Sequence, residues 1–148
     1  MLIRAATTDD AIALAVLSGQ LGYPADAAAI ARRLDDIAAH GSDLVLVAID
    51  AHGAACGFAQ AQARRLLIAE PFVEVAGLVV AEAARGSGVG AALLAAVETW
   101  AAEHGFAGMR VRSNVIRARA HRFYLRNGYA EHKRQAVFVK RLRSGSRT

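Results

Sequence analysis

The chain has 148 residues, of which 55% are apolar, and a formal net charge of +5 from 18 Lys and Arg against 13 Asp and Glu. This length predicts a single domain over residues 1–143, followed by a disordered tail over 144–148. No apolar run approaches the roughly 18 residues that span a bilayer, and the acids near the N-terminus argue against a signal peptide. The single cysteine, Cys56, excludes an intrachain disulfide, so we expect a cytoplasmic protein with no Cys/His metal cluster.

Hydrophobic periodicity and turn residues predict the element order β-α-α-β-β-β-α-β-α-β-β. In the first half these elements are strand 2–5, a helix capped by Thr7 or Thr8, a second helix that ends near Gly41, and strands 44–49, 54–67 and 72–80. Glu70-Pro71 is expected to break the chain before the last of these strands. The second half is predicted to hold helix 89–105, strand 108–115, helix 118–127 and two closing strands between 129 and 142. The order predicts an α/β fold, a mixed central sheet with helices on both faces.

The turn that follows strand 72–80 has the sequence Arg85-Gly86-Ser87-Gly88-Val89-Gly90, and a long apolar helix begins at Val89. Glycines let a backbone approach a ligand closely, and the N–H groups of such a turn and of the helix N-terminus can converge on an anion. The turn is therefore a predicted pyrophosphate site. No Lys follows Gly90, which excludes a Walker loop, and Ser113-Asn114 stands where a Rossmann unit would carry an acid.

Four segments in this order resemble the GCN5-related N-acetyltransferase (GNAT) superfamily. They are Leu78-Val79-Val80, the turn 85–90, Val111-Arg112-Ser113-Asn114, and Phe123-Tyr124-Leu125-Arg126-Asn127-Gly128-Tyr129. The resemblance covers roughly residues 72 to 130. It implies a sheet with splayed central strands and acetyl-coenzyme A as co-substrate, with no metal. It also implies transfer of the acetyl group to an amine by direct attack on the thioester.

The resemblance also implies which residues act. The backbone N–H groups of Arg85, Gly86, Ser87, Gly88, Val89 and Gly90 would hold the pyrophosphate. A backbone N–H on the strand Leu78, Val79, Val80 would face the thioester carbonyl as charge develops on its oxygen. Asn114 would contact the coenzyme, although it could equally cap the helix that starts at Ala118.

Two side chains are candidates for proton transfer. Tyr124 matches the family's tyrosine that protonates the departing thiolate, with a structural tyrosine as the alternative. Glu74, a carboxylate inside the apolar run 72–75, matches the base glutamate of some family members, with an outward-facing strand residue as the alternative. Other members place a glutamate on the strand before the asparagine, where this chain has Arg110 and Arg112. Cys56 is expected to be a small buried thiol.

The acceptor amine is left open between a metabolite, an aminoglycoside-like antibiotic and a protein, and a small molecule is favoured. The segment 18–24 is expected to form part of the acceptor wall.

The basic residues beyond position 110 are more simply solvated surface than a nucleic-acid face, because few aromatic residues lie among them. We expect no nucleic acid or membrane partner and a possible homodimer. A non-catalytic acyl-coenzyme A sensor would carry the same turn, and Tyr124 and Glu74 favour turnover over it.

Overall fold

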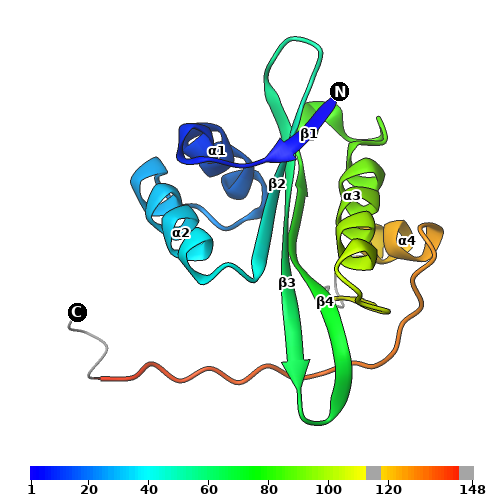
Figure 1. The fold of residues 1–148 in the computed structure, drawn as a ribbon. Helices are drawn as coiled ribbons and strands as arrows, with labels where there is room; N and C mark the ends of the chain where they lie inside the picture. The colour runs from blue at the N-terminus through cyan, green and yellow to red at the C-terminus, as the bar shows by residue number, and fades with distance from the viewer. Residues whose placement is uncertain (113–117, 144–148) are drawn as a thin grey trace. The chain divides into compact units, whose positions relative to one another are not determined.

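The computed structural model describes residues 1–112 and 118–143, which belong to two compact units, Met1–Arg112 and Ser113–Thr148. The first unit contains β1 (Leu2–Ala5), η1 (Thr8–Asp10), α1 (Ala11–Leu21), α2 (Ala27–His40), β2 (Asp43–Ile49), β3 (Ala55–Leu66), β4 (Ala69–Val80), η2 (Glu82–Ala84), α3 (Val89–Glu103) and β5 (Met109–Val111) (Figure 1). The second unit contains α4 (Ala118–Arg126), after which residues 127–143 form neither helix nor strand. Within these ranges no helix is both long and apolar enough to cross a bilayer.

The five strands of the first unit form one mixed sheet in the order β1-β2-β3-β4-β5. Each pair from β1 to β4 is antiparallel, and β5 runs parallel to β4. Helices α1 and α2 cover one face of this sheet and α3 covers the other (Figure 1). The predicted α/β fold with helices on both faces is confirmed.

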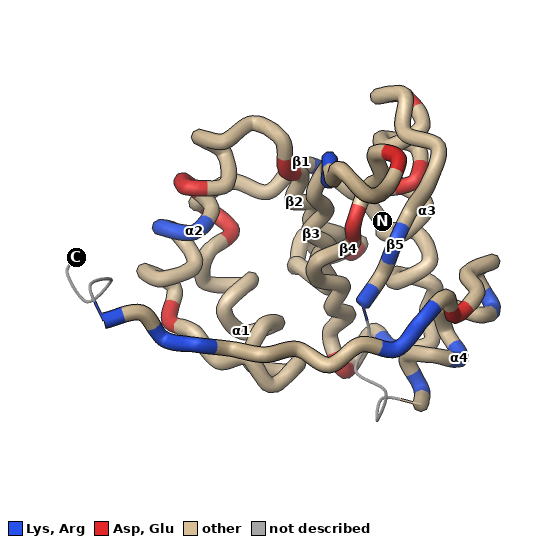
Figure 2. The backbone as a smooth tube through the Cα atoms, turned by 90° about the horizontal axis from the view of Figure 1, so that it is seen from below, with Lys and Arg blue, Asp and Glu red and all other residues tan. Residues whose placement is uncertain are grey.

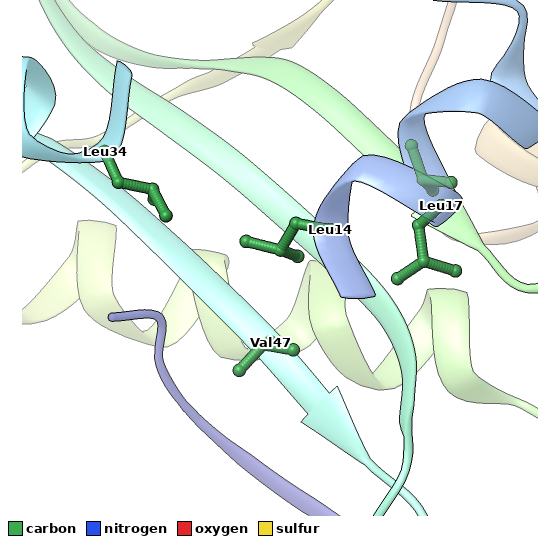
Figure 3. Close-up of a cluster of buried hydrophobic side chains, with 5 residues drawn as sticks. Leu14, Leu17, Leu34 and Val47 are labelled. Atoms are coloured by element: carbon green, nitrogen blue, oxygen red, sulfur yellow. The ribbon is translucent and has the colours of Figure 1, made fainter. Parts of the chain in front are cut away.

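A glycine allows α3 to lie close against the sheet. A Cβ added to Gly57 on β3 would lie 2.8 Å from the carbonyl oxygen of Val79 and 3.0 Å from the side chain of Val89. Leu93, Leu94 and Val97 of α3 are fully buried. The opposite face of the sheet is covered by Leu14, Leu17 and Leu34 of α1 and α2, which cluster with Val47 and Val79 (Figure 3).

The expected break at Glu70-Pro71 is wrong, because Pro71 lies inside β4. The β3–β4 hairpin turns instead at Leu67-Ile68, between the paired residues Leu66 and Ala69. The ladder shifts register between Arg64 and Leu66, opposite Pro71. A proline is tolerated at such an irregularity because no N–H is needed there.

The two closing strands expected between 129 and 142 are also wrong, since residues 129–143 form no strand. This segment has the β-branched and aromatic composition of a strand, but Val137, Phe138 and Val139 are 77%, 92% and 90% exposed. Such residues form a strand only where a sheet edge pairs with them. Composition alone does not supply that partner.

Asp10 ties the first strand to the first helix. Its carboxylate accepts two hydrogen bonds from the guanidinium of Arg4, at 2.8 and 2.9 Å, and a third from the N–H of Thr7 at 2.8 Å. The side-chain hydrogen bonds from Arg4 and the N–H of Thr7 lower the pKa of Asp10, against the opposing effect of burial. A carboxyl whose pKa is lower in the folded state stabilises the fold above its unfolded pKa, about 3.9.

We therefore expect Asp10→Asn to lower the free energy of unfolding by about 2 kcal/mol at neutral pH, because it removes charge-assisted hydrogen bonds. The difference from the parent should shrink as the pH falls below about 4, where the parent carboxyl takes up its proton. Urea unfolding at pH 7 and at pH 3 measures the free energy of unfolding of the variant and of the parent. Asp9→Asn, at the exposed neighbouring acid, is the control. A loss of equal size at both pH values would contradict the ion-pair explanation.

Candidate active site

The glycine turn connects the end of β4 to α3. After η2, the chain adopts positive φ at Gly86 (+82°) and at Gly88 (+88°), and Gly88 is the residue that precedes α3. Residues with a side chain rarely adopt this left-handed conformation, so both glycines are required for the path of the turn. No side chain caps the N-terminus of α3.

The N–H groups of this turn divide into two sets. Arg85 and Ser87 use theirs inside the turn, as donors to the carbonyl oxygens of Glu82 and Ala84. In the described part of the chain, the N–H groups of the four residues from Gly88 to Ala91 make no hydrogen bond. These four are the unpaired donors of a helix N-terminus, where the helix dipole also favours an anion. Sequence reasoning assigned the amides of residues 85–90 to the phosphates; among the described residues the N–H of Gly86 also makes no hydrogen bond, so the free amides are those of Gly86 and of Gly88 to Ala91.

Strand β4 has an unpaired edge next to this turn. β5 pairs with β4 only from Val73 to Val75. Ala76 follows immediately and has no partner in the β3 ladder, because Gln60 pairs with Gly77 and Ala61 with Val75. Such a β-bulge bends a strand, which separates β4 from β5 beyond this point. Among the described residues β5 ends at Val111 and β4 continues without a strand partner on that side, as the splayed strands of the resemblance require, and Gly77 was the sequence signal for the bulge.

The unpaired edge exposes the backbone of Leu78 and Val80. The N–H of Ala81 donates to Cys56 on β3 at 2.8 Å, and Val79 pairs with Phe58 two residues earlier. Backbone groups alternate between the two sides of an antiparallel strand. The N–H groups of Leu78 and Val80 therefore point away from β3, toward the edge that β5 leaves free. A donor for a thioester carbonyl, and polar groups for an extended amide-containing arm, are available there.

Glu74 is buried on the sheet face that carries α1 and α2. On β3, Phe58 packs against the α1–α2 cluster, and Gln62 lies on the same face because strand residues alternate. Glu74 pairs with Gln62 and is 8% exposed. Its carboxylate accepts from Arg64 at 3.4 Å and from Arg112 at 3.2 Å. The alternative of an outward-facing strand residue is excluded by this burial.

The segment between α1 and α2 is joined to the glycine turn. The side-chain oxygen of Gln20 accepts a hydrogen bond from the N–H of Glu82 at 3.0 Å, and Ser18 Oγ donates to the carbonyl of Tyr23 at 2.6 Å. These contacts place the expected acceptor wall, residues 18–24, beside the start of the turn. Asp26 then caps α2 by accepting from the N–H of Ala29 at 2.7 Å.

Tyr124 lies in the second unit, on α4. Its ring makes edge contacts with Phe123, at 5.2 Å between centroids, and with Tyr129, at 6.0 Å. The helix ends at Gly128, where φ is +90° and the N–H of Tyr129 donates to the carbonyl of Tyr124. Burial raises the pKa of the Tyr124 phenol, so the phenol keeps its proton at neutral pH. Asn114, the other candidate beyond β5, lies outside the described residues.

Cys56 is 6% exposed, and its thiol donates to the carbonyl of Ala48 at 3.5 Å. Burial raises the pKa of this thiol, which keeps it from being a nucleophilic thiolate. The prediction of a small buried thiol is confirmed.

A free strand edge, a bulge and a glycine turn with unpaired amides are the features that the family resemblance implies for holding an acyl-coenzyme A arm. Comparison with known proteins agrees. The sequence profile of the acetyltransferase (GNAT) family matches residues 13–129. The chain belongs to this family and is an acetyl-coenzyme A-dependent N-acetyltransferase.

Two kinds of relative are similar to this chain. Aminoglycoside N(6')-acetyltransferase type 1 of Stenotrophomonas maltophilia is 34% identical over 140 residues, which are 92% of this chain and 90% of the relative. Aminoglycoside 6'-N-acetyltransferase AAC(6')-Ig of Acinetobacter haemolyticus shares the fold with a TM-score of 0.82 and 21% identity, over 97% of this chain and all of that one. AAC(6')-Iy, in complex with a bisubstrate analogue that joins coenzyme A to acetylneamine, has a TM-score of 0.82 and 23% identity, over 95% of this chain and 98% of that one.

Proposed function

We propose that the chain acetylates a primary amine of a small molecule, and that aminoglycosides are the first class of acceptor to test. The support is the 34% identical relative, whose name gives that activity and which this chain matches over nearly its full length. The single, buried Cys56 and the use of acetyl-coenzyme A favour work in the cytoplasm.

We propose the following roles for the transfer. The amides from Gly88 to Ala91 bind the pyrophosphate, and an N–H of Leu78 or Val80 binds the thioester oxygen. Glu74 takes a proton from the acceptor ammonium, and the freed amine attacks the carbonyl carbon. The carbon–sulfur bond then breaks, and Tyr124 gives its proton to the departing thiolate. The nitrogen, which carries an extra proton after the attack, loses it to solvent, and solvent restores the proton of the Tyr124 phenol. Glu74 also releases its proton to solvent, and none of these steps needs a metal ion.

The observation that carries this proposal is the position of Glu74. Its buried carboxylate lies on the face of α1 and α2, two residues before the bulge that opens the edge of β4. A base at that place lies on the sheet face of α1, which leads into the expected acceptor wall, and on the same strand as the exposed amides. Burial of a charged group costs free energy, which favours a role in turnover over a sensor without catalysis.

An acceptor panel tests this function. Thiol release from acetyl-coenzyme A is followed with an aminoglycoside, a polyamine, an amino-acid amide and a lysine peptide. We expect release that depends on the aminoglycoside and exceeds release with the peptide. Release with the peptide alone would replace the small-molecule acceptor by a protein. Binding of the coenzyme without release by any amine would favour the sensor.

We also propose that the protein acts as a homodimer. Leu67 and Ile68 at the tip of the β3–β4 hairpin are fully or almost fully exposed, as are Phe138 and Val139 of the C-terminal segment. The two apolar side chains at the tip of the hairpin, and separately the two in the C-terminal segment, are each candidate contacts with a second copy. Glu131 is the only acid among residues 118–143, whereas residues 1–112 carry the other acids, so two copies offer opposite charges (Figure 2). Light scattering at several protein concentrations measures the oligomeric state. A monomer at every concentration would contradict the proposal.

A further inference from the structure

Three charged side chains from three neighbouring strands meet on the acceptor side of the sheet. Arg64 of β3 reaches one carboxylate oxygen of Glu74, Oε2, through Nη1 at 3.4 Å. Arg112, the residue after β5, reaches the other oxygen, Oε1, through Nε at 3.2 Å. Figure 2 shows basic positions in β5 and directly after it, on the strand that pairs with β4. One buried carboxylate therefore has two cationic partners.

The two arginines differ in how firmly they are held. The side chain of Arg64 is 34% exposed, whereas that of Arg112 is 63% exposed. Water can solvate the exposed guanidinium of Arg112 when it leaves, whereas the side chain of Glu74 is 10% exposed and its carboxylate needs a cation in that place. The guanidinium of Arg112 can therefore be exchanged at Oε1 for another cation, while Arg64 keeps Oε2 compensated. Elsewhere on this face the charged groups have other partners: Asp43 accepts from Gln62 at 3.3 Å, and Arg110 lies 4.1 Å from the ring centre of Phe72.

We infer that Arg64 is a positioning residue for Glu74, and that Arg112 is a displaceable cation which occupies the place of the acceptor ammonium. This rests on the proposed role of Glu74 as the base. The arriving ammonium replaces Arg112 at Oε1 and donates a charge-assisted hydrogen bond to it. One proton then passes from nitrogen to Oε1, which leaves a neutral amine and a neutral carboxyl. Arg64 holds the carboxylate oriented throughout.

This arrangement makes opposite predictions for the two arginines. Removal of the Arg64 guanidinium should lower kcat about tenfold or more, because the base loses its orientation. Removal of the Arg112 guanidinium should lower the KM for the acceptor several-fold with kcat nearly unchanged, because the ammonium no longer competes for Oε1. Methionine keeps most of the aliphatic stem, so Arg64→Met and Arg112→Met are the test variants.

Each test variant has a matched control on its own strand. Arg65→Met changes the residue that follows Arg64. The guanidinium of Arg65 lies 5.2 Å from the ring centre of Phe106. Arg110→Met changes the residue two positions before Arg112. Both controls should keep the parent values of kcat and KM. Thermal unfolding checks all four proteins, and Arg64→Lys, which restores a charge, replaces Arg64→Met if that variant does not fold.

Two readouts separate positioning from a structural effect. The acid limb of the pH–rate profile should move in Arg64→Met and not in Arg65→Met, because a cation beside the base is lost. Calorimetric titration with the acceptor, in the presence of coenzyme A, should give tighter binding to Arg112→Met than to the parent. A raised KM, or a kcat that falls as in Arg64→Met, would overturn the displacement of Arg112. Equal behaviour of Arg64→Met and Arg65→Met would overturn positioning.

The Glu74→Gln variant separates an error in the roles of the arginines from an error in the proposed base. If Glu74→Gln keeps the parent pH profile, Glu74 is not the base and both arginine roles are lost with it. If Glu74→Gln loses turnover but the arginine variants behave like their controls, Glu74 acts without them.

Discussion

Tyr124→Phe should lower turnover by roughly ten- to a thousandfold, because a general acid is typically worth 10²- to 10⁴-fold and water can partly replace it. The substitution keeps the ring that contacts Phe123 and Tyr129 and removes only the hydroxyl. The affinity for coenzyme A should change little, since a thioester sulfur is a weak hydrogen-bond acceptor. Steady-state kinetics and calorimetry measure the two quantities.

The loss should be smaller with an acyl donor whose thiol is more acidic, because its thiolate needs less help to leave. Tyr129→Phe is the matched control, since it removes a hydroxyl from the ring that packs on Tyr124, and it should keep the parent rate within about twofold. A Tyr124→Phe protein that loses affinity but keeps its rate would make Tyr124 a binding residue. A protein unchanged in both would leave it structural.

Glu74→Gln should depress turnover by about a hundredfold at low pH, where the acceptor amine is protonated, and by less as the pH rises and more of the amine is neutral. The amide has nearly the shape of the carboxylate, so the strand pairing of β4 should persist. The pH dependence of kcat/KM between about pH 6 and 10 measures the effect.

Glu70→Gln is the control for this variant, because Glu70 is an exposed carboxylate on the same strand. It should give the parent profile. A profile of unchanged shape in Glu74→Gln would transfer the role of base to an ordered water molecule. The buried ion pairs with Arg64 and Arg112 would then be a structural feature of the sheet.

The glycine turn and most of the fold follow from the sequence. Periodicity located α2 and α3, because each of these helices turns an apolar face to the sheet and ends at a recognisable turn or cap, and short apolar runs located β1 and β2. The turn itself was predictable because Gly86 and Gly88 need positive φ, and a strand before them with a helix after them fixes where the free amides lie.

Other features depend on contacts that the sequence does not encode locally. The bulge at Ala76 arises from a register shift, in which one residue of β4 has no partner on β3. Strand pairing joins residues that are distant in sequence, so a local pattern does not predict such a shift. The partners of Glu74 come from two other strands, 10 and 38 residues away along the chain. Arg112 drew attention as a departure from the family pattern, whereas nothing marked Arg64. The prediction of two closing strands was wrong because strand composition does not determine a pairing partner.

Calorimetric titration of coenzyme A tests the central claim most directly, because it needs no knowledge of the acceptor. Gly88→Val introduces a branched side chain at a φ of +88°, where a Cβ would meet no protein atom within 4 Å, so the protein should fold although the turn is strained. We expect the parent to bind coenzyme A and Gly88→Val to bind it at least about tenfold more weakly, roughly 1.4 kcal/mol. Equal affinity in a folded Gly88→Val protein would contradict the assignment of the pyrophosphate to this turn.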